Sequence, residues 1–139
     1  MNTAERKFRD KTETMYKSID GESVNEIENS VRDYVESLLY ENGIAAEICG
    51  VALYGSRSRG LERPDSDIDV VIEFVTDTKE YVLFNILNEE GFEISGVPVD
   101  INPIRHEESG SLSEYLDNAE KYLSEKSELI NDEIEYNLY

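Results

Sequence analysis

Apolar residues recur along this chain with two spacings, one typical of helices and one typical of strands. From Ser23 to Tyr40 they recur every three or four residues, which predicts a helix with one apolar face. Ser23 is a good N-cap for that helix, and Glu26 stands three residues further on, as a capping box requires. Residues 1–20 are polar and mixed in charge, so a short helix or a frayed arm is expected there.

Two more helices are expected in the second half of the chain. One covers residues 79–90, with Asp77 or Thr78 as its cap. The other starts within residues 111–113, where two serines can cap it, and it presents an apolar stripe at helical spacing. The acidic residues 127–139 continue that helix, form a separate one or fray.

Strand-like segments lie between these helices. Residues 44–54 read as the first strand, the apolar run at 70–74 as the second, residues 92–95 as a short third and residues 97–104 as another. The two prolines in the last segment suggest an edge position or strand ends. The pattern predicts an α/β (α+β) fold, in which a small mixed sheet carries packed helices and additional N- and C-terminal helices.

Length and composition narrow the class of protein. With 139 residues we expect a single domain over residues 1–139, with its core at about 23–105 and a helical extension at about 110–139. No apolar run approaches the roughly 18 residues that span a bilayer, and the N-terminus lacks the apolar core of a secretory signal. A cytoplasmic protein without membrane association is therefore expected. Cys49, the only cysteine, is expected to be a small buried hydrophobe rather than a nucleophile.

The charge is strongly negative and unevenly distributed. A formal net charge of -19 repels phosphates, which argues against extended nucleic-acid binding. Yet Arg57, Arg59 and Arg63 stand close together in the middle of the chain. A local arginine cluster on an acidic protein indicates a confined anion site, the alternative being an ordinary solvated surface.

A glycine-serine turn stands at the end of the first expected strand. The stretch from Val51 to Phe74 reads VALYGSRSRGLERPDSDIDVVIEF, which is two apolar runs joined by a Gly/Ser/Arg turn. At Gly55 the backbone can pass close to a phosphate, and the N–H groups and hydroxyl that begin at Ser56 can donate to it. The alternative is an ordinary turn, since the stretch has neither the lysine of a Walker-type loop nor a GxGxxG fingerprint.

Two aspartates lead the second apolar run, and a third lies on a later strand. Asp67 and Asp69 stand two residues apart, so on a strand their side chains point to the same face. Two close carboxylates repel each other unless a hard cation such as Mg²⁺ lies between them. A neighbouring strand can bring Asp100 beside them, and three carboxylates can hold two metal ions and activate an acceptor hydroxyl. The alternative is that all three are solvated residues at a strand entrance or on an edge strand.

Together these residues resemble the motif of the nucleotidyltransferase superfamily, which includes DNA polymerase beta, over about residues 44–105. The string GSRSRG…SDIDVVIEF is especially similar to the minimal nucleotidyltransferases of prokaryotes. Some of those are antitoxins that transfer AMP to a tyrosine of a partner HEPN ribonuclease. The segments GVPVDINPI and SLSEYLDNAEKYLSEK also resemble nucleotidyltransferase modules within large proteins of bacterial mobile elements.

The resemblance implies a nucleotidyltransferase fold and a metal-dependent reaction. Asp67 and Asp69 would bind Mg²⁺ (or Mn²⁺). Asp100 would complete the metal site and act as, or orient, the base on the acceptor hydroxyl. The acceptor would attack the α-phosphorus of a nucleoside triphosphate in line, with pyrophosphate leaving.

The resemblance also implies a nucleotide site. Gly55 and Ser56 would bind the triphosphate of the incoming nucleotide. Arg57 and Arg59 would be phosphate ligands, with Arg59 preferred because many members of the superfamily have a basic residue there. ATP is the expected donor and AMP the expected transferred group.

The acceptor half of the reaction is less well marked. The chain shows no separate acceptor-binding domain, which argues against a polymerase, a CCA-adding enzyme or a complete aminoglycoside nucleotidyltransferase. We therefore expect the acceptor to be a protein, such as a toxin-like partner. The acidic C-terminal helices are expected to form one wall of the site or a surface that binds the partner. The alternatives are an inactive nucleotide-binding or interaction module, and a small-molecule nucleotidyltransferase completed by dimerisation. His106 is expected in a surface loop, and four late tyrosines are expected to be packing or surface residues: Tyr115, Tyr122, Tyr136 and Tyr139.

Overall fold

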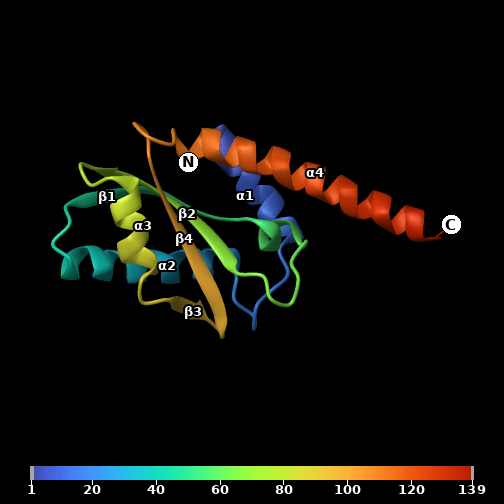
Figure 1. The fold of residues 1–139 in the computed structure, drawn as a ribbon, viewed down its shortest axis with the longest axis horizontal. Helices are drawn as coiled ribbons and strands as arrows, with labels where there is room; N and C mark the ends of the chain where they lie inside the picture. Colours follow the sequence, from blue (N-terminus) through green and yellow to red (C-terminus); the bar gives the residue numbers. More distant parts are fainter. Residues whose placement is uncertain (1, 139) are drawn as a thin grey trace.

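The computed structural model describes the course of the chain over residues 2–138 and the side chains over residues 2–130. Helices and strands alternate along most of the chain (Figure 1). The helical elements are α1 (Thr3–Met15), α2 (Val24–Glu41), the short 3₁₀ turn η1 (Ser56–Arg59), α3 (Glu80–Asn88) and α4 (Leu112–Leu138). The strands are β1 (Ala46–Tyr54), β2 (Ile68–Thr76), β3 (Phe92–Ile94) and β4 (Val97–Arg105).

The strands form one mixed sheet, as the sequence predicts. Their spatial order is β1-β2-β4-β3, with β2 and β4 parallel and the two outer pairs antiparallel. The crossover from β2 to β4 passes through α3, as a parallel connection requires. The predicted fold class, a small mixed sheet with packed helices and additional terminal helices, is confirmed.

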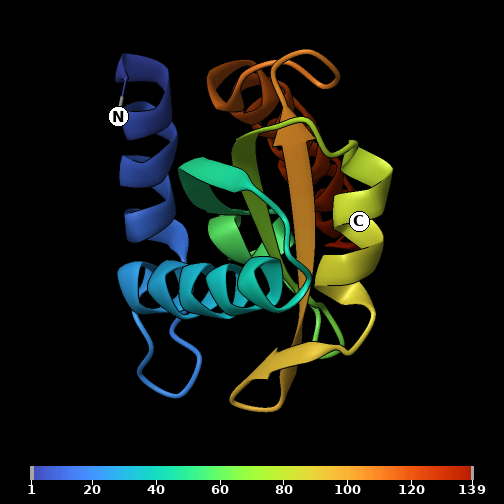
Figure 2. The same cartoon turned by 90° about the vertical axis from the view of Figure 1, so that its left-hand side faces the viewer.

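Helices cover the sheet on both faces (Figure 1). One apolar core joins α2 and α3 to the strands, and its centre includes Val31, Ile72 and Leu87. The second core lies under α1 and α4, where Leu116 packs near Val71. Figure 2 shows α1 and α2 next to β1, at one edge of the sheet. Both cores are therefore built on the same four strands.

The edge position suggested for residues 97–104 is wrong, because β4 lies inside the sheet between β2 and β3. The short β3 pairs only with residues 97–99 of β4, so the rest of β4 has a strand partner on one flank only. On the open flank the Asn88 side chain replaces a strand, donating to the carbonyl of Ile101 (2.8 Å) and accepting from its N–H (3.0 Å). Pro98 and Pro103 stand near the two ends of β4, which agrees with the other expectation, strand ends.

The helix boundaries are close to those expected. At α2 the Ser23 hydroxyl accepts the N–H of Glu26 at 3.1 Å, which confirms the predicted N-cap. The caps expected for α3 are wrong, since Lys79 occupies the N-cap position and no side chain caps the helix. α4 is one continuous helix to Leu138, with the Ser111 hydroxyl accepting the N–H of Glu114.

Two single-residue expectations have different outcomes. His106 is exposed in the turn after β4, as predicted. Cys49 is exposed too, so the prediction of a buried small hydrophobe is wrong. Cys49 stands at a register shift in β1 between Ile48 and Gly50, where the regular alternation of the strand is broken. Among the helices of residues 2–138, none is long and apolar enough to cross a membrane.

Candidate active site

The parallel pairing of β2 with β4 places two aspartates side by side. Asp69 stands directly opposite Asp100 in the register of the two strands. Opposite residues on neighbouring strands project to the same face, so both carboxylates leave the sheet together. Asp67 lies just before β2, two residues from Asp69, and is exposed. The sequence thus predicted correctly that a neighbouring strand brings Asp100 to the Asp67–Asp69 pair.

Burial and neighbouring negative charges raise the pKa of Asp69 and of Asp100. Burial is the largest cause of the raised pKa of Asp69, about 6, and the negative charges of Asp100 and Asp67 add to it. Burial, then the charge of Asp67, also raises the pKa of Asp100. Within residues 2–130 none of the three carboxylates forms an ion pair. The fold therefore holds acidic groups together without a nearby balancing ion pair.

The donor set fits a hard divalent cation, because carboxylate oxygens are its preferred ligands and it would relieve their repulsion. The set is not arranged as a finished metal site. Over the residues whose side chains are described, no three His, Cys, Asp or Glu side chains form a ready-made metal cluster. The pair of Asp69 and Asp100 is the part that the sheet itself brings together, and Asp67 stands exposed in the loop before the strand.

The glycine-serine turn lies against this pair. Gly55 follows β1 with φ 76° and ψ -169°, a conformation that is almost restricted to glycine. A Cβ added at Gly55 would lie 2.2 Å from Oδ2 of Asp69, so the main chain and the carboxylate are in direct contact. The Ser58 hydroxyl closes the turn by donating to the carbonyl of Gly55 at 2.6 Å. The backbone of Gly55 and the Asp69 carboxylate are therefore in close contact. Ser56, the first residue of η1, is half-buried beside them.

Arg57 and Arg59 both hydrogen-bond to other parts of the chain and so hold η1 in place. Arg57 donates through Nε and Nη2 to the carbonyl of Ser66, at 3.0 and 2.8 Å, which ties η1 to the loop before β2. Arg59 donates to Oε2 of Glu120 on α4 (2.9 and 2.7 Å) and to the Thr12 hydroxyl on α1 (2.7 Å). Its remaining donors reach the carbonyls of Ser58 and Phe8. The phosphate-ligand role expected for Arg59 does not agree with this placement, because its donors already have acceptors from distant parts of the chain.

A cavity of about 530 Å³ opens between the turn, Asp69 and α4. α4 thus forms one wall of the site, one of the two roles expected for the C-terminal helices. Ten residues line the cavity: Tyr54, Gly55, Ser56, Asp69, Tyr115, Asn118, Ala119, Tyr122, Leu123 and Lys126.

The roles of several residues that line the cavity are not predictable from the sequence. Tyr115 was expected only to pack, but its hydroxyl accepts from the Asn102 amide (2.7 Å) and donates to the Tyr54 hydroxyl (3.2 Å). The two tyrosine rings meet edge to face, with centroids 5.4 Å apart. Burial is the first cause of the raised pKa of Tyr54, and its hydrogen bond to Tyr115 the second, so this hydroxyl stays neutral.

Lys126 carried no signal in the sequence, because nothing there shows that α4 folds back over β2. Its charge lowers the pKa of Asp69, which places a cation on the α4 side of the cavity. Tyr122 lines the same wall and is 66% exposed. The side chain of Tyr136 and all of Tyr139 lie outside the described residues, so the prediction for them stays a prediction.

A mixed sheet with paired aspartates beside a glycine-serine turn defines a domain of the nucleotidyl-transfer class. The family model described as "Nucleotidyltransferase domain" matches residues 29–134, most of the chain, and includes every element from β1 to β4. The chain therefore belongs to the nucleotidyltransferase family, and its general function is nucleotidyl transfer. Searches of curated proteins and of solved structures gave no match.

Proposed function

We propose that this protein transfers AMP from ATP to a hydroxyl group of a partner protein, in a reaction that depends on Mg²⁺ or Mn²⁺. One observation carries the proposal. Asp69 stands opposite Asp100 on parallel strands, and the Gly55 main chain touches the Asp69 carboxylate. Carboxylates for a cation and a backbone turn for a phosphate therefore meet at one point, as transfer of a nucleotidyl group requires.

Asp69 and Asp100 would hold the cation, and Asp67 would become a third ligand when the cation binds. Their raised pKa values support this assignment, because burial and mutual repulsion favour any cation that enters. A bound divalent ion would neutralise charge on the phosphate oxygens and polarise the phosphorus. The three aspartates together would then serve both substrate binding and chemistry.

The triphosphate would lie along the turn. The backbone at Gly55 and the hydroxyl of Ser56 would donate to phosphate oxygens. In place of Arg59, the cationic group for the phosphates would be Lys126, which faces the site from α4. The nucleoside would lie against the α4 wall, where the ring of Tyr122 offers a stacking surface.

In the reaction, the acceptor oxygen would attack the α-phosphorus and form a new P–O bond. The bond from that phosphorus to the bridging oxygen would break, and pyrophosphate would leave with the electron pair. Asp100 would accept the proton of the acceptor hydroxyl, or orient the group that does.

For the acceptor we propose a protein: residues 2–138 build both apolar cores on one sheet, and a partner chain would bring its hydroxyl group to the site beside α4. ATP as the donor would fit a cytoplasmic location, which belongs to the same proposal. The net charge of -19 argues against an extended nucleic-acid acceptor.

The test is transfer of label from α-labelled ATP, GTP, CTP and UTP, with Mg²⁺, to components of a lysate of the source cell. The expected result is label from ATP on a protein band, absent with chelator and lost in Asp67→Ala. Label on a small molecule or RNA would replace the protein acceptor. Binding of ATP without label transfer or pyrophosphate release would instead favour an inactive nucleotide-binding module. A dimer whose cleft joins Asp100 to the second chain would favour a small-molecule enzyme.

A further inference from the structure

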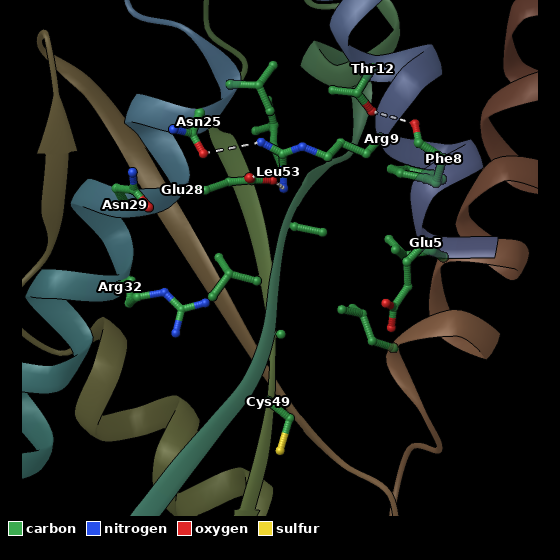
Figure 3. A pocket seen from close by; sticks show the side chains of 16 residues that line it. Glu5, Phe8, Arg9, Thr12, Asn25, Glu28, Asn29, Arg32, Cys49 and Leu53 are labelled. Carbon is green, nitrogen blue, oxygen red and sulfur yellow. Dashed lines mark hydrogen bonds and ion pairs between the residues drawn. The ribbon is translucent and has the colours of Figure 1, made fainter. Parts of the chain in front are cut away.

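The outer edge of β1 lies open along a groove. β1 pairs with β2 on one side, and within the described residues no strand pairs with its other side. A cavity of about 430 Å³ follows this edge between α1 and α2, lined by residues 49–53 of the strand (Figure 3). This size falls within the range of ordinary ligand pockets, about 300–1,000 Å³. The groove is separate from the carboxylate site, since it shares no lining residue with that cavity.

One end of the strand edge is closed by a buried acid. The N–H of Leu53 donates to Oε2 of Glu28 at 2.9 Å, so the backbone groups of Leu53 point away from β2. Arg9 of α1 pairs with the other oxygen of Glu28, which is only 6% exposed. The Glu28 carboxylate thus takes the place that a neighbouring strand would fill at Leu53.

The next outward-facing residue has no such partner. Along an antiparallel strand the backbone groups alternate between the two sides, so Val51 faces the groove as Leu53 does. Among residues 2–130, no group outside the sheet hydrogen-bonds to the backbone of Val51. An open pair of N–H and C=O groups at the floor of a groove is a template for another strand.

The groove also holds an unpaired cation. Arg32 of α2 is half-buried and points toward β1, with Asn29 beside it (Figure 3). Within residues 2–130 Arg32 forms no ion pair, although the protein carries a net charge of -19. A guanidinium kept in a groove of so acidic a protein is complementary to a carboxylate brought by a ligand.

We infer that this groove binds an extended segment of a partner protein, which adds to β1 as a strand and places a carboxylate side chain against Arg32. Main-chain bonds to Val51 would give affinity, and the pairing with Arg32 would give specificity. A second copy of the chain fits poorly, because α1 and α2 flank β1 and a paired β1 would bring both sets of helices together. The inference does not depend on the proposed transfer reaction.

The test is selection of a random nonapeptide library, displayed on phage, on the full chain. Enriched peptides should share an aspartate or glutamate at a fixed position. Synthetic copies should bind at least about tenfold more weakly to Arg32→Glu, as expected for loss of a charge pair. Arg63→Glu is the matched control, since Arg63 is exposed and lines neither cavity, and it should bind as the native chain does.

A second measurement does not rely on any variant. In the native chain, amide hydrogen exchange followed by NMR should show slower exchange at Val51 when a selected peptide is added. The inference is overturned if no peptide is enriched, or if the enriched peptides leave exchange at Val51 unchanged. Equal binding to Arg32→Glu, folded as judged by circular dichroism, would also overturn it.

Discussion

At Gly55 the main chain meets the Asp69 carboxylate so closely that no side chain fits between them. Gly55→Ala would place a methyl group 2.2 Å from Oδ2 of Asp69, at a backbone angle that alanine avoids. We expect this variant to lose at least about tenfold in ATP affinity, because the turn and the carboxylate must move apart. Titration calorimetry with ATP and Mg²⁺ measures the effect.

Gly91→Ala is a matched control for that change. Gly91 has the same φ of 76°, but a Cβ there meets nothing within 4 Å. It should lose about 1–2 kcal/mol of stability from the backbone conformation and keep its ATP affinity. If both variants bind ATP equally well, the contact at Gly55 has no part in the nucleotide site.

Asp69 makes the metal-free protein sensitive to pH. Burial and two neighbouring carboxylates raise its pKa in the folded protein from 3.8 to about 6. The folded state therefore holds this proton more tightly, so stability falls as pH rises from about 4 through 6 and stays reduced above that. Partial exposure limits the effect to about 1 kcal/mol.

Asp69→Asn should remove this part of the stability profile. Urea unfolding with a chelator, at about pH 5 and about pH 7.5, should show a smaller difference in the variant than in the native chain. Asp65→Asn, at an exposed position in the preceding loop, should leave the difference unchanged. An unaltered profile in Asp69→Asn would show that the carboxylate is not perturbed.

Between elements, Arg59 is the link that joins η1 to α1 and α4. Its side chain is 3% exposed, donates to Glu120 and Thr12, and lies over the Phe8 ring at 4.1 Å. Burial would raise the pKa of Glu120, but hydrogen bonds from Lys11 and Arg59 outweigh it, and the pKa is lowered. The ionised carboxylate of Glu120 thus ties α4, the helix that forms the cavity wall, to η1 and α1.

Arg59→Ala should cost about 3 kcal/mol of unfolding free energy, because it leaves buried acceptors without a donor. Arg63→Ala, at an exposed site four residues away, should change stability by less than about 0.5 kcal/mol. Chemical denaturation followed by circular dichroism measures both. A loss in Arg59→Ala no larger than in Arg63→Ala would mean that the link contributes nothing.

Tyr122 tests the role of α4 as the nucleoside wall. Tyr122→Ala should weaken ATP binding about tenfold, since stacking of a base on an aromatic ring contributes about 1–3 kcal/mol. Tyr81→Ala is the control, because Tyr81 is 70% exposed on α3 and does not line the cavity. Equal affinity of both variants for ATP with Mg²⁺ would place the nucleoside elsewhere.

The elements themselves follow largely from local sequence. Helical spacing with a serine cap locates α2, and apolar runs around the Gly/Ser/Arg turn locate β1 and β2. The interior place of β4 could not be read, because it depends on pairing with the distant β2 on one flank and with the very short β3 on the other. The exposure of Cys49 depends in the same way on a register shift that no periodic pattern reveals.

For the whole molecule, the part of the site that lies on neighbouring strands was predictable and the part that α4 supplies was not. Asp67 and Asp69 stand two residues apart at the head of a strand, and parallel pairing of that strand with a later one brings Asp100 to Asp69. Lys126 and Tyr122 reach the site only because a long helix packs across the sheet on the opposite side from α2. The contacts of Arg59 could not be read for the same reason, since its acceptor Glu120 is 61 residues away.

The central claim is that Asp69 and Asp100 form a metal-dependent nucleotide site with the Gly55 turn. Its most direct test is calorimetric titration of ATP into the native chain, Asp100→Asn and Asp65→Asn, each with and without Mg²⁺. The native chain and Asp65→Asn should bind ATP at least about tenfold more tightly with Mg²⁺, and Asp100→Asn should lose that gain. Equal ATP affinity with and without Mg²⁺ in the native chain, or a full Mg²⁺ effect in Asp100→Asn, would contradict the claim.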